Sequence, residues 1–235
     1  SLLREKGDTS FSVITAPLSF LTSVRYVITV DADTRLPRDT AAKLIGTAMH
    51  PLNRAVFDKT SGRITEGYGI LQPRISVSLE SSSRSLFSKI FSGYVGIDPY
   101  TTAVSDVYQD LFHEGSYTGK GLYDVDAFEA ALKNRFPENM ILSHDLLEGI
   151  FARTALLSDI EFIDDYPQSY HTFFTRQHRW TRGDWQAMPW FFKSGTPLIS
   201  RWKIFDNLRR SLVSPTSFLL LALSLISLPG SPAFW

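Results

Sequence analysis

Two aspartates, Asp31 and Asp33, directly follow a run of β-branched and aromatic residues at 24–30 that predicts a buried strand. In parallel α/β sheets, ligands bind beyond the carboxyl ends of the strands, which is where these side chains are expected. Two carboxylates one residue apart can bind a hard divalent cation, Mg²⁺ or Mn²⁺, which in turn bridges the phosphates of a nucleotide. A purely structural role in a turn or helix cap is the alternative when the pair is taken alone.

The chain contains a second D-x-D pair, Asp124 and Asp126. Asp126 stands three residues before Glu129, at the start of a helix expected over 127–132. This spacing is typical of a capping box, in which the two side chains bind backbone N–H groups of the first turn. We therefore assign the metal-binding role to the first pair alone.

Asp145 is the third candidate, at the start of a helix expected over 146–157. An aspartate that stays ionised at a helix N-terminus can act as a general base toward a sugar hydroxyl. Asp145 and Glu148 also match a capping box, so a structural role stays open. His144 is expected to be structural or to support its neighbour.

The segment 176–186 combines arginine, glutamine and tryptophan side chains. These can hold a diphosphate through charge-assisted hydrogen bonds and stack a sugar on an indole face. An aromatic, basic helix lying against a membrane is the other interpretation. Trp180, Trp185 and Trp190 advance by about 140° per step on a helix and so do not share one face, which favours a mixed role.

The elements that must position these groups alternate between strands and helices. Beyond the strand at 24–30, strands are expected at 69–77 and 160–164, and helices at 39–49 and 81–94. Residues 53–65 are expected to form a loop or hairpin, and Pro73 indicates that its strand lies at an edge or ends there. The alternation predicts an α/β domain with a mainly parallel sheet.

Composition narrows the function classes. The 235 residues are 43% hydrophobic and 20% charged, which is enough apolar material for a full core. Lys and Arg number 24, as do Asp and Glu, so there is no basic surplus of the kind that nucleic-acid binders carry. Cysteine is absent, which excludes disulfide scaffolds and thiol catalysis. The Gly-rich stretch at 115–121 is expected to be flexible, and its Gly119-Lys120-Gly121 lacks the spacing of a phosphate-binding P-loop.

The C-terminal part predicts two membrane elements. Residues 199–212 place four apolar side chains on one stripe with lysine and arginine off it, as in a helix lying in a membrane interface. The uncharged stretch over 211–235 is long enough to cross a bilayer, which takes about 20 residues. A buried core helix is the alternative. The basic flank predicts that the preceding residues face the cytoplasm. The stripe consists of Trp202, Phe205, Leu208 and Leu212.

In their order along the chain, these elements resemble the membrane-bound processive glycosyltransferases that include cellulose synthase. More specifically, six segments are similar to the glycosyltransferase segment of cyclic β-1,2-glucan synthases: VDADTRLPRDTA, GYGILQPR, GLYDVDAFE, SHDLLEG, RQHRWTRGDWQ and DNLRRSLVSP. The resemblance covers residues 24–225. It implies a partial GT-A-like (Rossmann-like) α/β catalytic domain over 1–198, an amphipathic interfacial helix over 199–212 and a transmembrane segment over 213–235.

The resemblance implies roles for the aspartates. Asp31 and Asp33 match the D-x-D motif that binds the metal and the UDP of the donor. Asp145 matches the catalytic base, which in the broader family ends a Thr-Glu-Asp motif, whereas this chain reads Ser-His-Asp. The carboxylates that hold uridine in the family lie upstream of the D-x-D, in sequence that this chain does not contain, so the later part of the catalytic domain is expected here.

The same resemblance covers the aromatic and basic segment. Gln177, Arg179 and Trp180 match the family's Q-(Q/R)-x-R-W motif, which binds the nucleotide sugar, although Arg176 stands where the family has its first Gln. Family members are thought to grow the glucan on a protein tyrosine. The candidates for the acceptor side are Tyr123 and Trp185.

Together the motifs imply an inverting hexosyltransferase that transfers glucose from UDP-glucose to a growing β-1,2-glucan at the cytoplasmic face of a bacterial inner membrane. The expected partners are UDP-glucose, a glucan acceptor and the lipid bilayer, without nucleic acid. A related membrane glycosyltransferase that makes another β-glucan is one alternative. A catalytically silent membrane scaffold that binds glucan is the other, although such a scaffold would not need Asp31, Asp33 and Asp145 intact.

Overall fold

The computed structural model describes Leu3 and residues 21–92, 106–137, 140–141 and 145–226. By their contacts the residues form two compact units. The first unit comprises Ser1–Pro137 with Asp145–Phe173, and the second comprises Glu138–His144 with Phe174–Trp235. The first combines strands and helices, and the described part of the second is helical.

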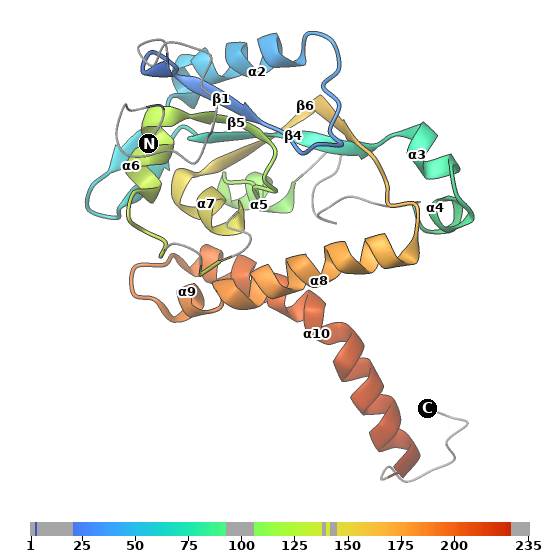
Figure 1. Cartoon of the computed structure of the whole chain (residues 1–235). Coiled ribbons are helices and arrows are strands. Elements are labelled where there is room, and N and C mark those ends of the chain that lie inside the picture. Colours follow the sequence, from blue (N-terminus) through green and yellow to red (C-terminus); the bar gives the residue numbers. More distant parts are fainter. Residues whose placement is uncertain (1–2, 4–20, 93–105, 138–139, 142–144, 227–235) are drawn as a thin grey trace. The chain divides into compact units, whose positions relative to one another are not determined.

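A four-stranded sheet forms the centre of the first unit (Figure 1). Its strands lie in the order β1 (Tyr26–Thr29), β5 (Gly121–Asp124), β4 (Ile70–Val77) and β6 (Thr154–Asp164). β5 runs antiparallel to both of its neighbours, whereas β4 and β6 pair in parallel. The α/β class is confirmed, and the three expected strands β1, β4 and β6 run in one direction, but the antiparallel β5 between them makes the sheet mixed.

The antiparallel pairing arises at β5, which the sequence did not predict as a strand. Its four residues are too few, and include too many polar positions, to give a strand pattern. The Gly-rich stretch leads into β5 at the edge where β4 ends, so β5 runs in the direction opposite to β4. β1, β4 and β6 consequently share one direction, and their carboxyl ends meet at the edge of the sheet where β5 begins.

Pro73 lies inside β4, which is an interior strand rather than the expected edge. The ladder between β4 and β5 covers only Ile70 and Leu71 of β4, so Pro73 stands beyond it. On the other side, the pairing with β6 shifts register between Pro73 and Arg74. An interior strand tolerates proline at such an irregularity, because the regular hydrogen-bond ladder is already interrupted.

Helices cover both faces of this sheet. α2 (Thr40–Met49) lies on one face, and α6 (Val125–Leu132) and α7 (Asp145–Ala152) lie on the other (Figure 1). The core under α2 joins one residue of that helix to residues of β4, β5 and β6. Its buried members are Leu44, Leu71, Leu122, Ala155, Ile160 and Phe162.

Two helix predictions were too long. The expected helix over 146–157 ends at Ala152, because Arg153 adopts a left-handed φ of 53° and β6 begins directly after it. A short apolar run does not by itself distinguish a buried helix from a buried strand. The expected helix over 81–94 is divided into α3 (Leu79–Ser83) and α4 (Leu86–Phe91) by a capping box at Ser85.

The remaining described elements of the first unit are short. The segment expected to be a loop or hairpin contains a hairpin. The bounds are η2 (Pro51–Asn53), β2 (Val56–Asp58), β3 (Arg63–Glu66) and α5 (Val107–Phe112).

The second unit contains most of α8 (Tyr170–Ala187), then α9 (Pro189–Phe192) and α10 (Leu198–Ile226). α10 is one continuous helix that includes the predicted interfacial segment and the described part of the predicted transmembrane segment, with Pro215 inside it. Of the predicted stripe, Leu208 is buried and the other three side chains are exposed.

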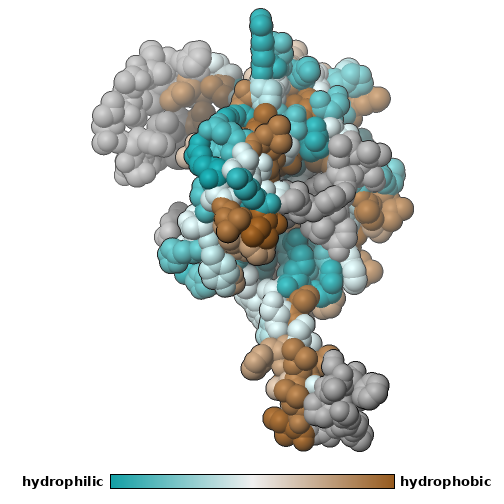
Figure 2. All heavy atoms as spheres, turned by 90° about the vertical axis from the view of Figure 1, so that its right-hand side faces the viewer, coloured by the Kyte–Doolittle hydropathy of each residue, from teal (hydrophilic) through white to brown (hydrophobic). Residues whose placement is uncertain are grey.

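α10 is the one described helix that is long and apolar enough, by length and composition, to cross a membrane. Only 6% of its most apolar 18-residue window is buried, whereas the core helix of a soluble protein is mostly buried. Figure 2 shows the resulting hydrophobic surface on the C-terminal part of the helix. Exposed apolar area of this kind favours the membrane interpretation over the buried core helix.

Candidate functional site

A cluster of charged side chains lies at the carboxyl edge of the sheet in the first unit. Asp31 follows β1, Asp164 ends β6, and Lys120 immediately precedes β5. The Lys120 Nζ atom is 3.0 Å from Asp31 Oδ2 and also binds Asp164 Oδ2. The first aspartate of the predicted D-x-D therefore has a lysine partner that sequence reasoning missed.

Lys120 is 4% exposed, whereas the side chain of Asp31 is 61% exposed. Burial alone would lower the pKa of Lys120, but hydrogen bonds and charges from Asp164 and Asp31 outweigh burial and raise that pKa. The Thr34 hydroxyl donates to Asp164 Oδ1 at 2.7 Å. The buried lysine is therefore a stable cation, and the more exposed of its two acidic partners belongs to the D-x-D.

The segment that carries the D-x-D is fixed to the end of β6. The Arg35 N–H donates to the Ile163 carbonyl oxygen at 2.7 Å, and the Ile163 N–H donates back at 3.0 Å. The Arg35 guanidinium also lies 3.5 Å from Asp165 and 3.6 Å from Glu80. These contacts hold Asp31 at the carboxyl edge.

Asp31 and Asp33 suit a divalent ion that is shared with a ligand. Both residues are exposed and carry the hard oxygen donors that Mg²⁺ and Mn²⁺ prefer. Among the residues that the structure describes, no group of three or more His, Asp or Glu side chains could enclose a metal. Mg²⁺ often binds through one or two carboxylates and completes its shell with water and substrate phosphates. The donor set therefore fits an ion bridging to phosphate better than a closed structural site.

Asp145 begins α7, and its carboxylate lies against Gly119, the residue before Lys120. A Cβ atom at Gly119 would stand 3.0 Å from Asp145 Oδ2 and 3.2 Å from Oδ1. Gly119 has a φ of +89°, which L side chains rarely adopt. Both observations favour glycine here, and the Gly-Lys-Gly run brings the predicted base to the same edge as the D-x-D. His144 lies outside the described residues.

The Gly-rich stretch expected to be flexible is tightly packed where the structure describes it. Tyr117 is 5% exposed, and its hydroxyl forms a 2.9 Å hydrogen bond with the Thr29 hydroxyl. The Thr118 N–H and hydroxyl both donate to Gln72 Oε1 at 3.0 Å. Buried hydrogen bonds to two strands replace the freedom that glycine would otherwise allow.

Glu148 lies one turn after Asp145 on α7. Burial, and secondly the charge of Asp145, raise the pKa of Glu148 to about 7. Burial and the charge of Glu148 in turn raise the pKa of Tyr123. Tyr123 is half-buried in β5, where its ring stacks on Phe128 at a centroid distance of 4.4 Å. The candidate acceptor-side tyrosine thus lies on the α7 side of the sheet, near Glu148.

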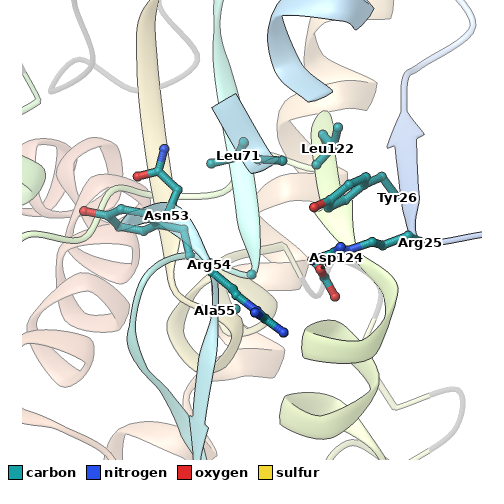
Figure 3. Close-up of a pocket in the computed structure, with 11 residues that line it drawn as sticks. Arg25, Tyr26, Asn53, Arg54, Ala55, Leu71, Leu122 and Asp124 are labelled. Atoms are coloured by element: carbon teal, nitrogen blue, oxygen red, sulfur yellow. Dashed lines mark ion pairs between the residues drawn. The ribbon is translucent and has the colours of Figure 1, made fainter. Parts of the chain in front are cut away.

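The second D-x-D has a structural position at the opposite edge of the sheet. Asp124 caps α6, because its Oδ1 accepts the N–H groups of Asp126 and Ala127 at 3.0 Å. The expectation that Asp126 is the N-cap of this helix is therefore wrong, because the N-cap is Asp124, two residues earlier. Asp124 also lines a pocket where its carboxylate lies 3.6 Å from Arg25 (Figure 3). None of the predicted site residues lines this pocket.

Gln177, Arg179, Trp180 and Trp185 all lie on α8, in the second unit. The Arg176 guanidinium lies over the Trp180 ring, 4.9 Å from its centroid. Arg176, which stands where the family motif has its first glutamine, thus contacts the tryptophan of the same motif.

Near its C-terminal end, α8 forms side-chain hydrogen bonds with α10. The Trp185 indole N–H donates to Ser211 Oγ at 3.1 Å, and Asn207 donates to Asp184 at 3.2 Å. Burial raises the pKa of Asp184 to about 6, although the charge of Arg210 and the Asn207 hydrogen bond oppose this. Trp185 therefore has a structural partner besides its predicted acceptor-side role.

The structure thus gathers Asp31, Asp33 and Asp145 at one edge, and comparison with known proteins adds the relationship. Over 215 residues, 90% of its length, the chain is 53% identical to the curated "Cyclic beta-(1,2)-glucan synthase NdvB" of Rhizobium meliloti (strain 1021). The chain is similar to a segment of a cyclic β-glucan synthase. The resemblance deduced from the motifs is thereby confirmed. The chain spans 8% of the length of that relative, and no protein-family model matches it.

Proposed function

We propose that this chain is part of the GT-A-like (Rossmann-like) catalytic region of a glycosyltransferase that transfers glucose from UDP-glucose to a growing β-1,2-glucan. The observation that carries the proposal is the carboxyl edge of the sheet, where the exposed Asp31 and Asp33 lie close to Asp145 through the Gly119-Lys120 contact. The 53% identity to a synthase of this kind supports the choice of product.

In this proposal Asp31 and Asp33 hold Mg²⁺ or Mn²⁺, which when bound offsets negative charge on the diphosphate. Asp145 accepts the proton of the acceptor hydroxyl, whose oxygen attacks glucose C1 from the face opposite the diphosphate and inverts its configuration. The position of Asp145 at the start of α7 favours its ionised form, because the helix dipole is positive there.

The α8 residues have the chemistry to bind the donor in the same reaction. Arg179 is exposed and can donate charge-assisted hydrogen bonds to a diphosphate, with Gln177 as a further donor. The half-buried Trp180 offers an indole face for stacking. On the acceptor side, Tyr123 and Trp185 remain the proposed contacts with the glucan.

We propose further that α10 anchors the catalytic region in a bacterial inner membrane, with the catalytic residues in the cytoplasm. Its large exposed apolar side chains after Leu212 support insertion. Arg209 and Arg210 lie just before this apolar part, and positive charges accumulate on the cytoplasmic side of membrane spans.

The test uses the full-length protein that carries this chain, in membranes, with UDP-glucose and Mg²⁺ or Mn²⁺. We expect metal-dependent UDP release and a β-1,2-linked product. Asp145→Asn should lower the rate about 10²- to 10⁴-fold, the usual contribution of a general base. Asp126→Asn is the matched control, because this exposed aspartate belongs to the second D-x-D.

Each other outcome identifies an alternative. UDP release with a different linkage would keep the mechanism and assign the chain to a related β-glucan synthase. A folded wild-type protein that releases no UDP would refute the enzyme and leave a glucan-binding scaffold. A rate unchanged in Asp145→Asn would remove Asp145 as the base.

A further inference from the structure

We infer that Lys120 binds the diphosphate of the sugar nucleotide, at the phosphate bonded to the transferred glucose, and stabilises its charge as it departs. The inference rests on the proposed function, because it concerns the same site. It arises from the Gly119-Lys120-Gly121 run, which has no phosphate-binding role by its spacing alone.

Lys120 has more acidic partners than a structural lysine needs. Asp164 is 7% exposed, and its two carboxylate oxygens are bound by the Thr34 hydroxyl and by Lys120. The buried ion pair of Lys120 and Asp164 is electrically neutral, because one lysine balances the charge of one aspartate. Asp31 is a second acid on the same ammonium, and it is exposed. The lysine thus extends from a buried anchor toward the open side of the edge.

The position of Asp31 puts a bound diphosphate within reach of Lys120. Asp31 would hold a divalent ion that binds phosphate, so a bound diphosphate would lie close to this carboxylate. Lys120 Nζ lies 3.0 Å from the same carboxylate. An ammonium has three N–H donors, and in the described structure two of them have carboxylate acceptors, Asp31 and Asp164. Phosphate oxygens are the acceptors that such a compact cation commonly binds.

The neighbours of Lys120 indicate which phosphate it binds. Gly119 lies against the carboxylate of Asp145, the proposed base. Gly121 is packed against the Leu71 carbonyl oxygen of β4, which fixes the backbone on the other side. Residue 120 therefore stands between the ion site and the base. The reacting glucose carbon must lie near the base, so the phosphate closest to Lys120 is the one bonded to that carbon.

Transfer of the glucose breaks one bond to C1 and forms another. The bond between glucose C1 and the β-phosphate oxygen breaks, and its electron pair stays on that oxygen. The acceptor oxygen bonds to C1, and the acceptor proton moves to Asp145. Lys120 remains protonated and donates a hydrogen bond to the phosphate, whose negative charge increases as the bond breaks.

The test compares the binding of UDP and UMP to the full-length protein in Mg²⁺, by equilibrium dialysis with labelled nucleotides. UMP lacks the β-phosphate. Lys120→Met should weaken UDP binding about 10- to 100-fold, as expected for a lost hydrogen bond to a charged group, and leave UMP binding nearly unchanged. The matched control is Lys133→Met, which removes an exposed lysine paired with Glu129.

A second variant separates phosphate binding from folding. Lys120→Met leaves the buried Asp164 without its cation, which can destabilise the protein. The double variant Lys120→Met with Asp164→Asn removes both charges and keeps an acceptor for Thr34. We expect this variant to fold and still to lose UDP affinity relative to UMP.

Two results would overturn the inference. Wild-type UDP affinity in the folded double variant would make Lys120 only a structural partner of Asp164. Equal losses of UDP and UMP affinity would show a displaced site rather than a lost phosphate contact. Failure of the proposed function is distinguishable, because the wild-type protein would then bind neither nucleotide.

Discussion

Gly119→Ala is the sharpest test of how the loop positions the proposed base. The new Cβ would stand 3.0 Å from Asp145 Oδ2 and 3.2 Å from both Cγ and Oδ1, so the carboxylate must move by a few tenths of an ångström. A displacement of 1 Å at a reacting group can cost about 10²-fold in rate, and we therefore expect kcat to fall about 3- to 10-fold. The φ of +89° adds about 1–3 kcal/mol of backbone strain.

Gly195→Ala is the matched control for the strain. Gly195 has a similar φ of +85°, but nothing lies within 4 Å of the point that a Cβ atom would occupy there. Both variants should lose comparable stability in thermal unfolding, and only Gly119→Ala should lose kcat for UDP release at saturating UDP-glucose. UDP affinity should persist in both. Equal kcat values for the two variants, each measured below its unfolding transition, would refute the role of Gly119 in positioning Asp145.

Two further predictions concern charge and helix docking. Burial, and secondly the charge of Asp145, raise the pKa of Glu148 from 4.5 to about 7. Between pH 4.5 and 7 the folded state therefore binds more protons than the unfolded state. The free energy of unfolding of the wild-type protein should fall by about 3 kcal/mol as the pH rises through this range. Glu148→Gln should remove this slope, measured by denaturant unfolding at pH 4.5, 6 and 8; an unchanged slope would contradict the assignment. Trp185→Phe and Ser211→Ala should each lower the free energy of unfolding by about 1 kcal/mol, because each removes the hydrogen bond between the indole and the serine. In a double-mutant cycle the two losses should not add. Strict additivity would mean that this hydrogen bond contributes nothing to stability.

Sequence patterns were reliable where one element determines its own structure. The strand at 24–30 and the helix at 39–49 correspond to β1 and α2, because a β-branched run and helical composition are local signals. The end of α7 was misplaced because the apolar residues that follow fit either a helix or a strand. What decides there is pairing with β4, which depends on residues far away in the chain.

The site followed the same division. The positions of Asp31 after a strand and of Asp145 at the start of a helix were predicted, and the structure places both residues there. Lys120 and Asp164 were not, because an ion pair between residues 44 apart depends on which strand ends meet. Only the structure shows that Lys120 is buried, and a buried lysine is almost always paired with an acid.

The direction of β5 decides which chemistry the carboxyl edge contains. Because β5 is antiparallel to β1, Gly121 pairs with Thr29 near Asp31, and Asp124 pairs with Tyr26 at the far end. If β5 ran parallel to β1 instead, Lys120 would lie at the amino edge and the second D-x-D beside the first. The short strand that the sequence did not reveal therefore does two things. It separates the capping aspartates from the candidate ion site, and it brings a buried cation to the place where the proposed reaction needs positive charge.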